Sequence, residues 1–267
     1  MAKRQKILAK IQEFTLMDDD FMTVAFDNDI PCTQYVLRII MQNDTLIVKS
    51  VKTQYEIKSL QGRSVRLDVR AEDSSGKIYD IEIQNLNRGA GARRARYNSA
   101  LMDANALRSS DDFGKLRDTY VIFITENDVM KRGQEVYVYD RTEKVSGEHL
   151  GDGTHIIYVN GRYKDNQSEI GRLIHDFMCR SSDDMYNAAF AERARFVKRE
   201  EAGEMCEVLE EVRAEGHAEG VAEGVASGQR DFVERLIQYG KLTCREIAKL
   251  TKLPLSEIEK IAGLKTT

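Results

Sequence analysis

The sequence has few of the residues that build zinc or disulfide sites. Among 267 residues it has no tryptophan, four cysteines and four histidines. The cysteines, Cys32, Cys179, Cys206 and Cys244, lie far apart and form no C-x-x-C pair, and no histidine cluster completes a zinc site. We therefore expect reduced thiols in a cytoplasmic protein.

Long apolar runs and an excess of positive charge are also absent. No run approaches the roughly 18 apolar residues that a membrane span needs, and the opening "MAKRQKILAKIQEF" is too polar for a signal sequence. The formal net charge is −4, so any binding of nucleic acid requires a local basic patch. The length favours one main domain with an accessory piece.

What is present alternates between helix and strand patterns. A continuous apolar run, "TYVIFIT" at 119–125, is typical of a central strand that is covered on both faces. We expect further strands within 45–59, 66–84, 135–141 and 154–160, and helices at 3–14, within 15–26, at 33–42, 89–107 and 168–179. In the 89–107 helix, Ala100, Leu101, Ala104 and Leu107 share one side. The order predicts an α/β fold with a mixed central sheet flanked by helices.

The character of the chain changes near residue 190. We predict a first domain at 1–190, a charged helical connector at 191–230 and a short helix-turn-helix-like region at 231–267. In the connector, glycine recurs every fourth residue from 216 to 228, and each glycine weakens a helix by about 1 kcal/mol relative to alanine. The final pair of helices could place one helix on DNA or pair with a second copy of the chain.

The stretch "RLDVRAEDSSGKIYDIEIQ" at 66–84 predicts a β-hairpin with an unusual charge pattern. A three-residue loop at 74–76 ends in glycine, where a left-handed backbone is needed. Because the side-chain period of a strand is two, polar positions must face polar positions. Counting outward from this loop predicts three facing pairs: Arg70 with Asp80, Asp68 with Glu82, and Arg66 with Gln84.

The facing acids Asp68 and Glu82 have two interpretations. Like charges directly opposite one another destabilise a sheet. Both acids could be solvated at the surface, with Arg66 and Arg70 softening the repulsion. Alternatively they share a divalent cation, since Mg²⁺ is typically held by one or two carboxylates together with water and phosphate oxygens.

A local run of arginines follows the hairpin. Arg88, Arg93, Arg94 and Arg96 lie between residues 86 and 98, a segment without any acid. Two of them fall near the start of the predicted 89–107 helix, where the helix dipole disfavours cations. An anionic partner would offset this cost, although the arginines could also be exposed and reach back to nearby acids.

Together, "LDVRAEDSSGKIYDIEIQ", "RRARYNSAL", "YVIFIT" and the "DDDFMTVAF" entry helix resemble the PD-(D/E)XK nuclease superfamily. The closer resemblance is to its branch of nuclease-family transposases, or recombination-promoting nucleases, and it covers most of the chain. It implies a restriction-endonuclease-like α/β core, here with a helical C-terminal extension. The hairpin motif is the specific part of the resemblance, and the glycine-rich tail is not specific.

The resemblance also implies roles for individual residues. Asp68 and Glu82 would bind Mg²⁺, for which Mn²⁺ could substitute, with the Ile83 carbonyl and the acid Asp20, or its neighbour Asp19, as further ligands. Gln84 would position the attacking water, although the superfamily pattern has lysine at this place. Arg94 and Tyr97 would contact phosphate, with Arg93 and Arg96 completing the DNA-binding patch.

These observations predict a Mg²⁺-dependent DNA endonuclease, linked to recombination or to a mobile element through the family name alone. The alternative is an inactive or weakly active protein on the same fold that binds nucleic acid and forms homo-oligomers through its C-terminal helices.

Overall fold

The computed structural model describes residues 12–59, 62–85, 87–198, 232–234, 236–238, 242–251 and 253–262. Most of the predicted helix at 3–14, residues 3–11, and most of the predicted connector at 191–230 lie outside these residues. The chain divides into two compact units, Met1–Gly203 and Glu204–Thr267.

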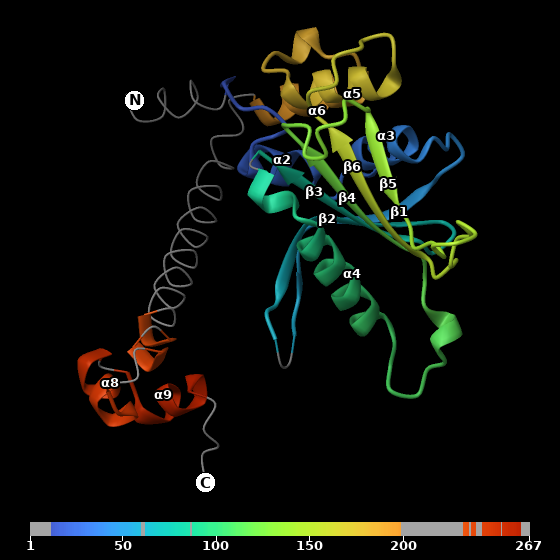
Figure 1. The fold of residues 1–267 in the computed structure, drawn as a ribbon. Coiled ribbons are helices and arrows are strands. Elements are labelled where there is room, and N and C mark those ends of the chain that lie inside the picture. The colour runs from blue at the N-terminus through green and yellow to red at the C-terminus, as the bar shows by residue number, and fades with distance from the viewer. Residues whose placement is uncertain are drawn as a thin grey trace, which may run out of the picture. The chain divides into compact units, whose positions relative to one another are not determined.

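The first unit is built on a mixed sheet. In the described residues, six strands lie in the order β1-β2-β3-β4-β6-β5 (Figure 1). Pairing is antiparallel from β1 to β3 and between β5 and β6, and parallel between β3, β4 and β6. The strands are β1 Val48–Ile57, β2 Val65–Asp73, β3 Ile78–Gln84, β4 Thr119–Thr125, β5 Val136–Tyr139 and β6 Thr154–Asn160. Together with the flanking helices, this confirms the predicted α/β fold class.

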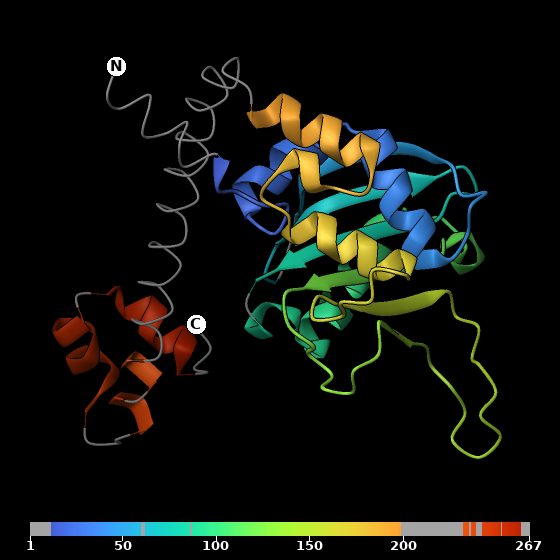
Figure 2. The same cartoon turned by 90° about the horizontal axis from the view of Figure 1, so that it is seen from above.

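Helices cover both faces of the sheet, unequally. Helices α2 Asp19–Phe26, α3 Ile30–Met41, α5 Glu169–Met178 and α6 Ala188–Lys198 lie on one face, and α4 Ala92–Ala106 lies on the other (Figures 1 and 2). Short 3-10 turns η1 Asn87–Ala90, η2 Phe113–Lys115 and η3 Ser182–Asp184 connect these elements. All seven residues of β4 are buried, which confirms the strand predicted from its unbroken apolar run.

Local sequence signals explain where the helices start. Asp29 accepts a hydrogen bond from the Cys32 backbone N–H and caps α3, whose second residue is Pro31. The Ser168 hydroxyl accepts from the Gly171 N–H and caps α5. Helix α6 begins at Ala188, so the predicted boundary at residue 190 lies inside a helix whose Phe190 is in the core.

The β2–β3 hairpin has the predicted loop and register. Gly76 has a φ of +87°, and the Asp73 N–H donates to the Lys77 carbonyl. Arg70 lies opposite Asp80, as counted from the loop. The paired residues end at Val69 and Ile81, so Asp68 and Glu82 lie just beyond the last pair.

The C-terminal unit contains α8 Cys244–Thr251 and α9 Leu255–Ile261. Its described core consists of Val233, Ile247 and Ile258. A capping box starts α8, because the Thr243 hydroxyl accepts from the Glu246 N–H while the Glu246 carboxylate accepts from the Thr243 N–H. Self-association through these helices stays a prediction. No helix in the described segments is both long and apolar enough to cross a membrane.

Candidate functional site

The hairpin places three of the predicted site residues together. Asp68 is on β2, and Glu82 and Gln84 are on the adjacent strand β3. The Gln84 amide nitrogen lies 3.5 Å from both Asp68 Oδ2 and Glu82 Oε2. Asp68 Oδ2 also accepts a hydrogen bond of 2.9 Å from the Ile83 backbone N–H. Beyond the last backbone pair, the Asp68 carboxylate thus connects β2 to β3 in place of a backbone carbonyl. The two carboxylates therefore meet at the end of the paired segment.

Arg94, on the first turn of α4, meets the same group of side chains. Its Nη2 forms an ion pair with Glu82 Oε2, and its Nη1 donates to Gln84 Oε1 at 3.4 Å and to the Gly89 carbonyl at 3.1 Å. Glu82 is fully buried, whereas the Arg94 side chain is 39% exposed. Arg94, which we predicted to contact phosphate, is thus bound to a predicted metal ligand in this structure.

A second acid and an amide lie behind Glu82. Asp80 and Asn98 are both buried. Asn98 Nδ2 donates to Asp80 Oδ2 at 3.0 Å and to Glu82 Oε1 at 3.3 Å. The repulsion expected between acids on this face is therefore offset by an arginine and an amide from α4.

Burial of these acids disfavours their charged forms. Burial, followed by the charge of Glu82, raises the pKa of Asp68 well above its usual range. Burial raises the pKa of Asp80 to about 7. Burial, followed by the charge of Asp80, raises the pKa of Glu82 to about 9, and the Arg94 guanidinium acts in the opposite direction. A proton or another cation is therefore favoured at this cluster.

The glycine of η1 leaves room for Gln84. A Cβ at Gly89 would lie 1.6 Å from Gln84 Oε1, far inside van der Waals contact, while a Cβ at Gly91 would meet no atom within 4 Å. Only the absence of a side chain at residue 89 lets the Gln84 amide lie where it contacts both Asp68 and Glu82.

One acid of α2 acts on the pair through its charge. We predicted Asp20 as an additional ligand, with Asp19 as the neighbour. It is the charge of Asp19 that contributes to raising the pKa of Asp68. Desolvation and Asp20 raise the pKa of Asp19 itself, whereas Arg66 lowers it, and Gln54 donates to it at 3.4 Å. Asp19, and not the predicted Asp20, is therefore the acid of α2 whose charge acts on Asp68.

The remaining predicted DNA-binding residues lie on the exposed side of α4. Arg93 and Arg96 are exposed. Tyr97 is 37% exposed, and its hydroxyl donates to the Arg63 carbonyl in the connection between β1 and β2. The connected ends of β1 and β2 project past the rest of the sheet on the α4 side (Figure 1). Arg94 and Tyr97 therefore contact different neighbours, although they are one helical turn apart.

The donor set fits a hard divalent cation. Asp68 and Glu82 supply carboxylate oxygens, which Mg²⁺ prefers, and the Arg94 guanidinium already serves as a positive counter-charge on Glu82. In the part of the chain that the structure describes, no group of three or more histidine, cysteine, aspartate or glutamate side chains is arranged to hold a metal ion. A cation here would rest on two carboxylates, completed by water and substrate oxygens.

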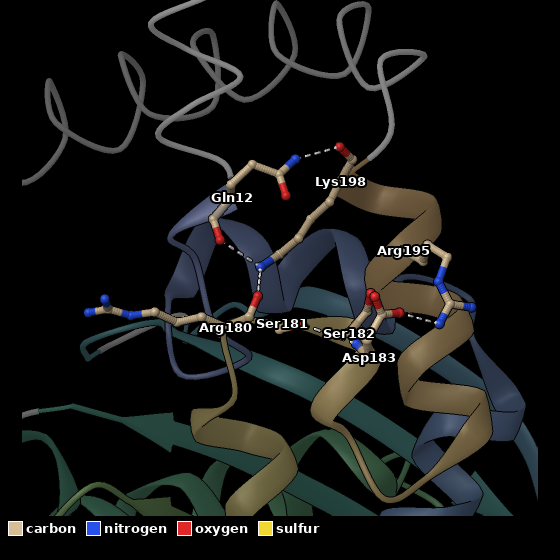
Figure 3. Close-up of a pocket in the computed structure, with 7 residues that line it drawn as sticks. All are labelled: Gln12, Arg180, Ser181, Ser182, Asp183, Arg195 and Lys198. Atoms are coloured by element: carbon tan, nitrogen blue, oxygen red, sulfur yellow. Dashed lines mark hydrogen bonds and ion pairs between the residues drawn. The ribbon is translucent and has the colours of Figure 1, made fainter.

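A separate surface cavity of about 400 Å³ lies between residue 12 and helix α6 (Figure 3). Its charged groups are already engaged: the Lys198 ammonium donates to the carbonyls of Gln12 and Arg180, and Arg195 pairs with Asp183. The cavity shares no residue with the acid pair. Lys198 and Arg195 thus connect α6 to residues 12, 180 and 183, and because both cations are engaged in these contacts we assign no ligand to the cavity.

The buried side of α4 is not the side that its apolar residues share. The predicted stripe of Ala100, Leu101, Ala104 and Leu107 is exposed or half-buried. The buried residues are instead Ala95, Asn98, Ser99 and Met102. The physical reason is that α4 packs on acids of β3, so polar side chains are favoured there. A search for polar residues at helical spacing after the arginines would have found Asn98.

Comparison with known proteins agrees with this geometry. The model of the PD-(D/E)XK nuclease family transposases matches residues 35–170, which include the hairpin, η1, α4 and β4. No curated protein and no solved structure matched the chain. Since the family model covers half of the sequence and the fold is the mixed sheet expected of it, the chain belongs to the PD-(D/E)XK nuclease family transposases.

Proposed function

We propose that this chain is a Mg²⁺-dependent DNA endonuclease that acts in the cytoplasm. The observation that carries the proposal is the meeting of Asp68 and Glu82 with the Gln84 amide 3.5 Å from an oxygen of each. Bound Mg²⁺ would polarise the phosphate and lower the pKa of a water molecule. The carboxylates would hold the cation, the Gln84 amide would orient the water, and the exposed Arg93 and Arg96 would bind the DNA backbone.

Arg94 would have two roles in this function, as the counter-charge of Glu82 and as a contact of the phosphate. Gln84 is neutral where the superfamily pattern has lysine, so the positive charge must come from elsewhere. The Arg94 guanidinium lies against both Glu82 and Gln84 and is partly exposed. It is thus positioned to balance the carboxylate before the cation arrives and to meet a phosphate oxygen afterwards.

One observation favours a second function, binding without cleavage. Glu82 is already neutralised by Arg94 and hydrogen-bonded by Asn98, so this carboxylate is satisfied without a cation. A protein that keeps this arrangement in the presence of Mg²⁺ would hold nucleic acid through its arginines without turnover.

Incubation of supercoiled plasmid with the purified protein and Mg²⁺ distinguishes the two functions. Endonuclease activity predicts nicked and linear products for the wild type and for Asp44→Ala, which alters an exposed acid, and none above background for Asp68→Ala. Nicking that persisted unchanged in Asp68→Ala would reject the assigned site. No nicking by the wild type, together with salt-dependent DNA binding, would favour the second function.

A further inference from the structure

Asn98 occupies a place in α4 where an apolar residue would be expected. It is 1% exposed, in the middle of the helix, and shares the buried face with Ala95 and Met102. Asparagine is a poor residue for a helix interior, and a buried amide costs free energy unless it is hydrogen-bonded. Its presence there therefore calls for a specific partner.

The partners of Asn98 are two carboxylates. The amide group has two N–H donors, and the two acceptors are Asp80 Oδ2 at 3.0 Å and Glu82 Oε1 at 3.3 Å. If the amide were turned over, its oxygen would lie against both acids. The two acceptors therefore fix the orientation of the amide.

Asn98 also determines which oxygen of Glu82 is left for the site. Oε1 is taken by Asn98, whereas Oε2 is the oxygen near Gln84, which in turn reaches Asp68 Oδ2. Because a carboxylate is planar, holding Oε1 from behind turns Oε2 toward the Asp68 side. Without this hydrogen bond the Glu82 carboxylate would be held through Oε2 alone, by Arg94 and Gln84, and Oε1 would have lost its Asn98 donor.

The arrangement is a poor one for stability alone. Asp80 Oδ1 and Asn98 Oδ1 are buried and have no hydrogen-bond partner among the described residues. Unsatisfied buried oxygens lower stability, and such violations concentrate at functional sites. This cost favours a role in holding the site over a role in packing.

We infer that Asn98 is a positioning residue: its amide, oriented by Asp80, holds Glu82 so that Oε2 and Asp68 Oδ2 present their lone pairs to one divalent cation. The inference rests on the proposed function, because it assigns Glu82 the role of a cation ligand. Asn98 itself touches neither the cation nor the DNA.

Asn98→Leu tests this inference, because leucine has a similar shape but no donor. Isothermal titration with Mn²⁺ should give a dissociation constant about 10- to 100-fold weaker than that of the wild type, the usual effect of losing a hydrogen bond that orients a metal ligand. Ser99→Ala is the matched control, since Ser99 is the next residue of the helix and is also buried. Its affinity should stay within about twofold of wild type, below the range for an orienting residue. The unfolding temperature of each variant separates a change in affinity from a change in stability.

Asp80→Asn provides a second variant if Asn98→Leu does not fold. The amide at residue 80 is nearly isosteric with the acid but holds Asn98 less strictly, so Mn²⁺ affinity should fall in the same direction by a smaller factor. Wild-type Mn²⁺ affinity in the folded variants would overturn the inference and leave the proposed function standing. A wild-type protein that binds no Mn²⁺ would overturn both.

Discussion

The two faces of strand β3 differ in what their residues do. Tyr79, Ile81 and Ile83 belong to the large apolar cluster beneath α2, α3, α5 and α6. On the other face, Asp80 and Glu82 are equally buried but meet Arg94 and Asn98 of α4. One strand therefore contributes alternate residues to a core that stabilises the fold and to a charged cluster that costs stability.

This difference between the two faces of β3 explains why the fold accommodates the facing acids Asp68 and Glu82. The apolar face buries enough surface to fix β3, so the register of the hairpin does not depend on the charged face. The charged face can then keep acids whose pKa values are raised by burial. Because side chains alternate between the two faces of a strand, the seven residues of β3 supply one face that stabilises the fold and one face that carries the acids of the site.

The largest effect is expected when adjacent residues on the two faces of β3, Ile81 and Glu82, are substituted separately. Glu82→Gln should reduce plasmid nicking on the order of 10³-fold, since a metal ligand supplies several kcal/mol to the transition state. Ile81→Val should cost about 1 kcal/mol of stability, as for deletion of one buried methyl group, and leave nicking per folded molecule unchanged. Equal loss of nicking in both variants, with both folded, would mean that the two faces do not have separate roles.

The second prediction concerns stability against pH. An acid whose pKa is raised on folding binds more protons in the folded state, so stability falls as pH rises from its unfolded to its folded pKa. For Asp80 this window runs from 3.8 to about 7, and for Glu82 from 4.5 to about 9. Urea unfolding should show the wild type losing on the order of a few kcal/mol across these windows. Glu82→Gln and Asp80→Asn should each flatten the curve.

Two comparisons check this pH prediction. Asp44→Asn, which neutralises an exposed acid, should follow the wild-type curve. Added Mg²⁺ should stabilise the wild type more at pH 9 than at pH 6, because metal ligands must be deprotonated. Parallel curves for Glu82→Gln and the wild type would show that burial does not raise the pKa of Glu82.

A smaller effect is expected from the turn that follows β3. Gly89→Ala places a methyl group on Gln84 Oε1 and should displace the Gln84 amide, whereas Gly91→Ala meets nothing. Nicking should fall about 10- to 100-fold in Gly89→Ala, as for loss of an orienting group, with Mn²⁺ affinity largely kept. Equal nicking rates for the two alanine variants would exclude a role for the placement of Gln84.

The smallest effect is expected on the exposed side of α4. Arg93→Gln combined with Arg96→Gln should weaken DNA binding measured without divalent cations, and the slope of log affinity against log salt should decrease by about 1 to 2. Lys131→Gln combined with Lys144→Gln removes two exposed cations elsewhere and should leave that slope unchanged. An equal decrease for both pairs would indicate a diffuse electrostatic effect without a defined patch.

The sequence predicted the parts of the site that depend on local pattern. The alternation of β2 and β3 and the loop ending in Gly76 determine which residues face one another, so Arg70 opposite Asp80 could be counted from the turn. The acids Asp68 and Glu82 follow from the same count. The apolar run of β4 likewise predicted a strand that is buried on both faces.

The sequence could not predict contacts that depend on tertiary packing. Which side of α4 meets the sheet is decided by the acids beneath it, and the apolar residues of the helix pointed to the opposite side. The resemblance to the superfamily paired Tyr97 with Arg94 as phosphate contacts, while the structure brings Asn98 to the acids. The closeness of Gly89 to Gln84 depends on the path of η1, which no residue pattern specifies.

The most direct test of the proposed site is a crystal structure of the protein with Mn²⁺, whose anomalous scattering locates the ion. We expect one anomalous peak about 2.1 Å from Asp68 Oδ2 and from Glu82 Oε2, with Arg94 moved away from Glu82. A structure at saturating Mn²⁺ with no peak at these oxygens, and with Arg94 still paired with Glu82, would contradict it.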